Sequence, residues 1–215
     1  MTLLSHPLYL APVPLYTELY RSNAVLFDGC TPFIKQTFRN RAIIATENGT
    51  QSLTIPVVHN GQNTPMRDIR ISEHGNWRHQ HWNAIVSAYR KSPFFDYYAD
   101  DFAHFYEERD GFLMDLNLRL HGTVCELLGL EREVHIITDI EELESISSTS
   151  TNDLRRIAEP KALTSIEGYT AHPYYQVFSQ RHGFIPNLSI ADLLFNMGPE
   201  GLITLRESIN NVNSI

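Results

Sequence analysis

The sequence lacks the features of disulfide scaffolds, membrane spans and nucleic-acid binders. It has two cysteines in 215 residues, Cys30 and Cys125, outside any Cys-x-x-Cys arrangement, so neither a disulfide framework nor a zinc knuckle is indicated. No apolar run approaches the roughly 20 residues of a membrane span. The formal net charge of -8 argues against nucleic-acid binding, which needs a basic face. No lysine or arginine precedes Arg21, so we expect no signal peptide and a cytoplasmic protein.

Signatures of common cofactor and nucleophile sites are also missing. Gly-x-Gly-x-x-Gly, Gly-x-x-x-x-Gly-Lys-Ser/Thr, Gly-x-Ser-x-Gly and His-Glu-x-x-His do not occur, and we expect no cofactor. His74, His79 and His81 form a His-x4-His-x-His cluster. On a helix, however, His79 and His81 are separated by about 200° and cannot share one ion, so no metal site is expected.

The residues that are present predict an α/β fold in one domain covering residues 1–215. Apolar runs at 8–11 and 24–27 predict strands, and Asn48-Gly49 between two β-rich runs predicts an antiparallel hairpin. From Trp77 onward the hydrophobic period changes to that of helices. We expect a mixed sheet that contains the hairpin and is flanked by helices.

Residues 141–153 have an unusual composition. They are acidic, rich in serine and threonine, and without aromatic side chains. This composition predicts a mobile loop with no catalytic role.

A local basic cluster stands out in a chain that is acidic overall. Lys35, Arg39 and Arg41 fall within seven positions, and Asn40 lies between the two arginines. Arginine offers a planar fork that fits phosphate or carboxylate, and lysine offers a mobile point charge. These four residues are therefore candidates to bind an anionic ligand. The alternative is a solvated surface cluster, and spacing alone does not decide between the two.

Two residues are candidates for catalytic proton transfer. Asp28 follows the predicted strand 24–27, where α/β proteins often present a functional carboxylate, although it can equally form a turn before Gly29. His81 lies on the apolar stripe of a predicted helix. It is either a satisfied core histidine or, if it faces a cleft, a general base. Cys30 is either a nucleophile beside the basic cluster or a small buried hydrophobic residue.

Several short motifs run over nearly the whole chain in a specific order. They are Phe27-Asp28, Phe33-Ile34-Lys35, Arg39-Asn40-Arg41, Leu53-Thr54-Ile55-Pro56-Val57, then Trp77, His81, Tyr89, Lys91 and Pro93, and finally residues 187–196 with Gly198. Together they resemble the WbqC-like family, a bacterial group often associated with O-antigen and other surface-polysaccharide gene clusters. This chain departs from the family in two places. The opening lacks the usual Gln-Pro, and the region after Ile137 looks abbreviated, without the expected further strand.

The resemblance implies a transferase-like role in polysaccharide assembly, in which a glycyl, other aminoacyl or acyl group passes to a sugar. On this hypothesis the basic cluster holds an anionic donor (nucleotide-sugar, aminoacyl or acyl donor), and Asp28 or His81 removes a proton from the sugar acceptor. Asp192, in the last matching motif, is added to the substrate-binding candidates. We expect neither nucleic-acid binding nor membrane insertion. The alternative is a non-catalytic binding or assembly protein of a polysaccharide pathway.

Overall fold

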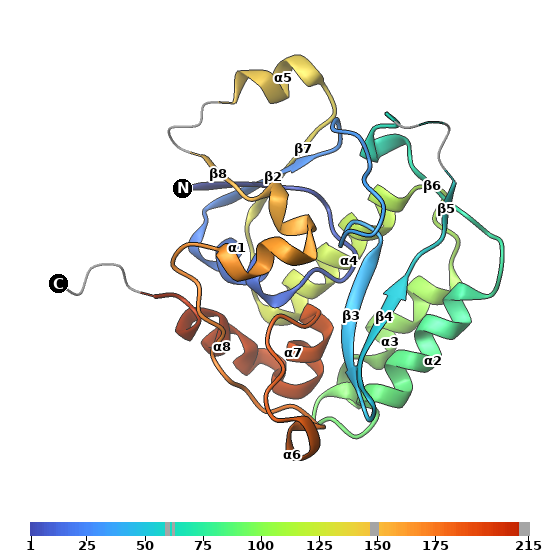
Figure 1. Cartoon of the computed structure of the whole chain (residues 1–215), viewed down its shortest axis with the longest axis vertical. Coiled ribbons are helices and arrows are strands. Elements are labelled where there is room, and N and C mark those ends of the chain that lie inside the picture. The colour runs from blue at the N-terminus through green and yellow to red at the C-terminus, as the bar shows by residue number, and fades with distance from the viewer. Residues whose placement is uncertain (59–60, 62, 147–150, 211–215) are drawn as a thin grey trace.

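Four short strands form a parallel sheet at one end of the molecule (Figure 1). The computed structural model describes residues 1–58, 61, 63–146 and 151–210. The strand order is β7-β2-β1-β8, and all three pairings are parallel. The strands are β1 Thr2–Ser5, β2 Ala24–Asp28, β7 Glu133–Ile137 and β8 Thr151–Asp153.

The predicted hairpin is present and forms a sheet of its own. β3 Arg41–Thr46 pairs with β4 Gly49–Thr54, and Gly49 adopts a φ of 112° at the turn. A second antiparallel pair joins β5 Val57–Val58 to β6 Arg70–Ile71. The α/β class with an antiparallel hairpin and flanking helices is therefore confirmed, with the hairpin outside the parallel sheet.

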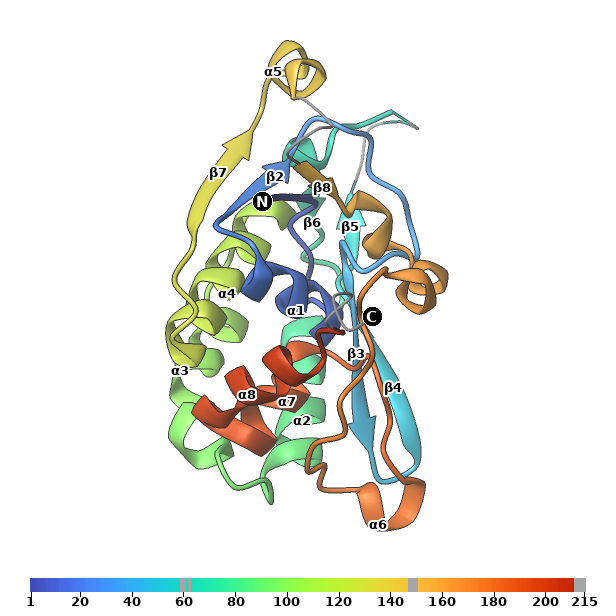
Figure 2. The same ribbon diagram turned by 90° about the vertical axis from the view of Figure 1, so that its left-hand side faces the viewer.

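Helices fill the rest of the molecule. Figure 2 shows the β3–β4 hairpin along one side and α3 and α4 along the other. No helix in the described ranges is both long and apolar enough to cross a bilayer. The α-helices are α1 Val13–Arg21, α2 Trp77–Tyr89, α3 Phe95–Glu107, α4 Leu113–Leu128, α5 Ile140–Ser145, α6 Ser179–His182, α7 Ile190–Met197 and α8 Gly201–Glu207. The 3-10 turns are η1 Met66–Asp68, η2 Arg155–Ala158, η3 Pro160–Ser165 and η4 Gly198–Glu200.

The parallel sheet is packed differently on its two faces, because side chains alternate along a strand. Val25 and Phe27 of β2 lie in the main hydrophobic core, which includes residues of α1 and α4. Leu4 and Ile137 belong to a smaller cluster with Leu143 of α5. Both faces of the parallel sheet therefore pack against apolar side chains, which fix the positions of its strand ends.

The strand predicted at 8–11 is wrong, because the first strand lies earlier in the chain. Leu10 has a φ of 40°, in the left-handed region, and this interrupts any extended run. The backbone N–H of Tyr9 instead donates to the carbonyl of Phe38 at 2.9 Å. The apolar side chains of this segment fill the core without joining a sheet.

A helix and a strand occupy most of the stretch 141–153, where a mobile loop was predicted. The side chain of Asp139 accepts a hydrogen bond from the backbone of Glu141 and so caps α5. β8 pairs with β1, while residues 147–150 lie outside the described residues. β8 shows that the region after Ile137 does contain a strand.

Candidate functional site

The carboxyl ends of the parallel strands bring ionisable side chains together. The chain runs from β1 to β2 and on to β7 in one direction, and then returns to place β8 on the other side of β1. In open parallel sheets, ligands bind beyond the strand ends at the point where the strand order reverses. His6 follows β1 and Arg155 follows β8, on the two sides of that point. We call His6, Asp28, Arg39 and Arg155 the strand-end cluster.

Asp28 is the buried anion of this cluster and accepts four hydrogen bonds. Its Oδ1 accepts from the backbone N–H of Cys30 at 2.8 Å and of Thr31 at 3.0 Å. Its Oδ2 accepts from Thr31 Oγ1 at 3.0 Å and from Arg155 Nη1 at 3.2 Å. Burial favours the neutral acid, but these donors outweigh it and hold the pKa of Asp28 below its usual value. Asp28 therefore stays charged and positions its neighbours, with little capacity left to accept a proton.

His6 is the neutral member of the cluster. Its Nδ1 lies 3.2 Å from the carbonyl oxygen of Asp28 and 4.0 Å from the Asp28 carboxylate. Burial, and then the charge of Arg39, lower the pKa of His6 to about 4. A carbonyl can only accept, so the proton of the neutral ring sits on Nδ1 and Nε2 keeps its lone pair. Nε2 is therefore the ring atom that can accept a proton, and a pKa of about 4 makes it a weak base at neutral pH.

Arg39 is a buried cation with few fixed partners. Its side chain is 4% exposed, and the one hydrogen bond of its guanidinium to a described residue runs from Nη1 to Thr37 Oγ1 at 3.4 Å. Its Nε is buried without a partner among the described residues. Burial lowers the pKa of Arg39 to about 10, opposed by the charges of Asp28 and Glu159, so the group remains charged at neutral pH.

Arg155 is the member of the cluster that reaches solvent. Its Nη1 bonds the Asp28 carboxylate at 3.2 Å and its Nη2 bonds Asp153 at 2.6 Å. Its side chain is 30% exposed, whereas those of Asp28 and His6 are buried. Arg155 is therefore the member of the cluster that a ligand in solvent can contact directly.

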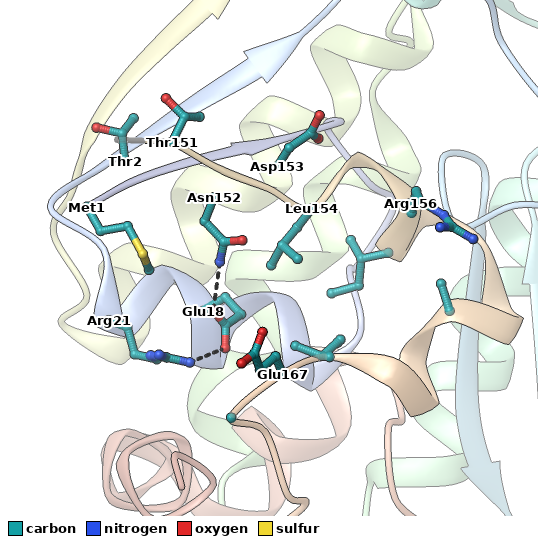
Figure 3. Close-up of a pocket in the computed structure, with 14 residues that line it drawn as sticks. Met1, Thr2, Glu18, Arg21, Thr151, Asn152, Asp153, Leu154, Arg156 and Glu167 are labelled. Atoms are coloured by element: carbon teal, nitrogen blue, oxygen red, sulfur yellow. Dashed lines mark hydrogen bonds and ion pairs between the residues drawn. The ribbon is translucent and has the colours of Figure 1, made fainter. Parts of the chain in front are cut away.

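A cavity of about 870 Å³ lies along β8, beside the cluster (Figure 3). Asp153 lines this cavity and also bonds Arg155, so it connects the two features. Glu18 and Arg21 of α1 lie on one side of it, and η2 and η3 close the other. The cavity volume is in the range of small-molecule sites.

The structure separates the predicted basic cluster. Arg39 joins the strand-end cluster, whereas Lys35 is exposed on the loop that leads to it. Asn40 is buried and donates to the carbonyl of Ile55 at 2.8 Å. Arg41 is half-buried and its Nε bonds Thr54 of the hairpin at 3.3 Å. Of these residues, Arg39 has the surroundings of a ligand-binding group, and Asn40 and Arg41 support the hairpin.

The other two predicted site residues lie in the protein interior. His81 is buried on α2, where its Nδ1 is 3.0 Å from Tyr9 Oη. Burial lowers the pKa of His81 to about 4. Asp192 is fully buried on α7 and accepts hydrogen bonds from Tyr174 and Gln176. The described contacts of both residues are those of core groups, and none of them is to the strand-end cluster.

Two residues of the cluster were not among the sequence candidates. His6 lies two positions after the apolar pair Leu3-Leu4, which is too short to predict a strand. Arg155 follows β8, whose polar composition predicted a loop. In the described ranges no group of three or more acidic, histidine or cysteine side chains could hold a metal ion.

Comparison with known proteins confirms the family resemblance, although the last motif, residues 187–196 with Gly198, lies outside the matched segment. The model of the WbqC-like protein family matches residues 7–176, a segment that contains Asp28, Arg39 and Arg155 and begins next to His6. The uncharacterized protein Rv1507c of Mycobacterium tuberculosis is 30% identical over 198 residues, covering 81% of this chain and 84% of the relative. No solved structure matches the chain.

Proposed function

Because the chain belongs to the WbqC-like protein family, which is associated with O-antigen and other polysaccharide biosynthesis, we propose that it is a transferase of such a pathway. It moves an acyl or aminoacyl group from a phosphate-bearing donor to a hydroxyl or amine of a sugar. The observation that carries this proposal is the strand-end cluster, where two arginines and a neutral histidine meet at the reversal of strand order.

The two arginines of the cluster bind the phosphate of the donor. Arg39 is buried with an unused Nε, and Arg155 holds two carboxylates while reaching solvent. Guanidinium groups bind phosphate oxygens through paired N–H donors. A bound phosphate replaces Asp153 as a partner of Arg155 and leaves the Asp28 contact in place.

His6 accounts for the proton transfer. Its Nε2 accepts the proton of the acceptor hydroxyl or amine while that atom forms a bond to the carbonyl carbon of the donor. In an acyl phosphate or adenylate the bond from the carbonyl carbon to the phosphate oxygen then breaks and the phosphate leaves with the electron pair, whereas in a coenzyme A thioester the carbon–sulfur bond breaks and the thiolate leaves. Arg155 stabilises the charge on the leaving phosphate, and the Asp28 carbonyl keeps the ring of His6 oriented.

One observation favours a non-catalytic binding protein as the second candidate. Asp28, His6 and Arg39 are at most 4% exposed, and a fixed buried ion cluster can be purely structural. A binding protein needs the arginines but not the lone pair of His6. The two candidates therefore differ in what substitution of His6 does.

The test measures donor binding and transfer separately. A nucleotide-sugar, a coenzyme A thioester and a non-hydrolysable aminoacyl adenylate analogue are titrated calorimetrically into the wild-type protein and into Arg155→Gln. We expect at least one donor to bind, and its affinity to fall at least tenfold in Arg155→Gln. The matched control Arg206→Gln makes the same change at an exposed arginine of α8 and leaves the affinity unchanged.

The donor that binds is then assayed for transfer with wild type and His6→Gln. A transferase loses about 100-fold or more in kcat in His6→Gln while its donor affinity stays within a few fold. Full transfer in His6→Gln contradicts the proposed base, and a bound donor that is never consumed favours the binding protein. No binding of any donor, or equal binding by Arg155→Gln, rejects the phosphate site.

A further inference from the structure

We infer that a cavity at the start of α2 is a binding site for a sugar ring. The cavity has a volume of about 380 Å³ and lies between the start of α2, the loop that precedes it and the end of α3. The described residues that line it include none of the strand-end cluster. The inference therefore goes beyond the proposed function, because sugar binding at this cavity requires neither a donor nor transfer.

The first observation is a set of buried N–H donors without acceptors. Trp77 is 5% exposed, and its Nε1 is buried without a partner among the described residues. The Nε and Nη2 of Arg78 are buried in the same state, while its Nη1 donates to Glu73 Oε2 at 2.9 Å. A buried donor that lacks an acceptor destabilises the protein. Trp77 and Arg78 both line the cavity, so they favour a ligand that brings several acceptor oxygens.

These donors are held in place at the helix start. The guanidinium carbon of Arg78 lies 4.5 Å from the centroid of the Trp77 ring, and His81 packs edge-on against that ring with centroids 5.1 Å apart. The side chain of Asn76, the N-cap residue, makes no capping hydrogen bond. The first backbone N–H groups of α2 therefore add further donors to those of the two side chains.

The charges of the lining are balanced, which argues against a charged ligand. Its two arginines and two glutamates are Arg78, Arg109, Glu73 and Glu107. Glu73 Oε2 lies 2.9 Å from Arg78 Nη1 and 3.9 Å from Arg109 Nε. His79, which also lines the cavity, accepts a hydrogen bond from Asn83 Nδ2 at 3.1 Å and adds no charge in that state. A neutral hydroxyl can donate to the carboxylates and accept from the arginines, whereas the carboxylates repel an anion.

The second observation is an aromatic surface beside these polar groups. Trp82 is half-buried, lines the cavity and lies one helical turn after Arg78 on the same face of α2. Its ring stacks on Tyr106 of α3, with centroids 5.6 Å apart and an interplanar angle of 24°. Tyr106 is fixed in turn by a hydrogen bond of 2.8 Å to Tyr9. A fixed indole fits the apolar face of a sugar ring, while the donors and carboxylates fit its hydroxyls.

The test uses the two tryptophans of the chain as reporters, because both of them line this cavity. Their indole N–H signals are followed by NMR of the full chain while methyl glucoside, methyl galactoside or N-acetylglucosamine is added. We expect at least one of these sugars to shift both signals in a saturable way. Glycerol has hydroxyls but no ring face, and phosphate is an anion, so neither of these two control ligands should give a saturable shift.

Variants locate the site and control for folding. Trp82→Ala removes the stacking surface and is expected to weaken sugar binding at least tenfold, which corresponds to about 1.4 kcal/mol. Arg78→Gln keeps both reporters and is expected to weaken binding about tenfold, so it decides the question if Trp82→Ala does not fold. The matched control Arg90→Gln makes the same change at the exposed end of α2 and leaves binding unchanged.

The inference is overturned if none of the sugars gives a saturable shift, if glycerol or phosphate shifts the signals as strongly, or if Arg78→Gln binds like wild type. These measurements need no donor and no turnover, and His6→Gln should bind the sugar like wild type. A protein that binds the sugar but transfers no group therefore contradicts the proposed function and leaves this site intact.

Discussion

Asp192 is a buried carboxylate, and its negative charge lowers the stability of the fold. Its Oδ2 accepts from Tyr174 Oη at 2.7 Å and from Gln176 Nε2 at 3.0 Å. Burial raises the pKa of Asp192 to about 6, although these donors favour the charged form. Because the native pKa lies above the unfolded value, ionised Asp192 destabilises the fold above pH 6, and stability is regained as the pH falls from 6 toward 3.8.

We therefore predict that Asp192→Asn is more stable than wild type at pH 8. The amide keeps an acceptor for Tyr174 and Gln176 and removes the buried charge, for a gain of about 1–2 kcal/mol. Urea unfolding at pH 8 and pH 5 measures the difference, which should shrink at the lower pH. A loss of stability at pH 8, or an equal difference at both values, contradicts this assignment.

Single residues also show how much of the site could be predicted from the sequence. Asp28 and Arg39 were candidates because a carboxylate after a strand and an arginine near it are visible locally. His6 and Arg155 were not, since their proximity depends on the pairing of β1 with β8, which are about 150 positions apart. The sequence also leaves the role of Arg39 open, because a ligand-binding arginine and a solvated surface arginine differ in their burial.

At the scale of elements, local composition predicted those parts that local contacts stabilise. The hairpin was found because the Asn48-Gly49 turn and its two strands are contiguous, and α4 ends at Gly129 with a φ of 65° as a glycine C-cap predicts. β8 was missed because Thr151–Asp153 has no apolar residue and is stabilised by pairing with β1. The first strand was predicted at 8–11 because that segment is more apolar than β1. Its backbone turns at Leu10 instead.

The end of α7 depends on a glycine for two separate reasons. Gly198 has a φ of 55°, and a Cβ at this position would lie 2.5 Å from Cδ1 of the Phe94 ring. Gly129 has a similar φ of 65° but nothing within 4 Å of a Cβ. The ψ of Gly129 is 30°, in the left-handed region that other residues can enter, whereas the ψ of Gly198 is -136°, a combination essentially restricted to glycine, so backbone strain and steric overlap both act at Gly198.

We predict that Gly198→Ala destabilises the protein more than Gly129→Ala. The backbone cost is about 1–2 kcal/mol at Gly129 and larger at Gly198, and the overlap with Phe94 adds about 1–3 kcal/mol at Gly198 alone. Thermal and urea unfolding of both variants give the difference. Equal losses would contradict the prediction, and the double variant Gly198→Ala with Phe94→Ala should recover the part of the loss that the overlap causes.

At the scale of the whole molecule, the interior holds three neutral histidines from distant parts of the chain. Burial lowers the pKa of His6, His81 and His121 to about 4 in each case. In the unfolded chain these groups take up a proton near pH 6.5. The unfolded state thus binds more protons than the native state between about pH 6.5 and 4, and stability falls as the pH falls through that range.

We predict that the free energy of unfolding decreases as the pH falls from 7 to 4.5, with a slope set by these groups. Each histidine contributes about 1.4 kcal/mol per pH unit, and Asp192 and Glu18, whose pKa values burial raises, oppose part of this effect, so the net slope is less than three protons. Urea midpoints measured from pH 7 to pH 4.5 give this slope. His121→Gln should flatten it by one proton, because this ring no longer titrates on unfolding. Asp192→Asn is the control of opposite sign and should steepen it by one. If both variants keep the wild-type slope, the buried histidines are not the groups that set the acid stability of the fold.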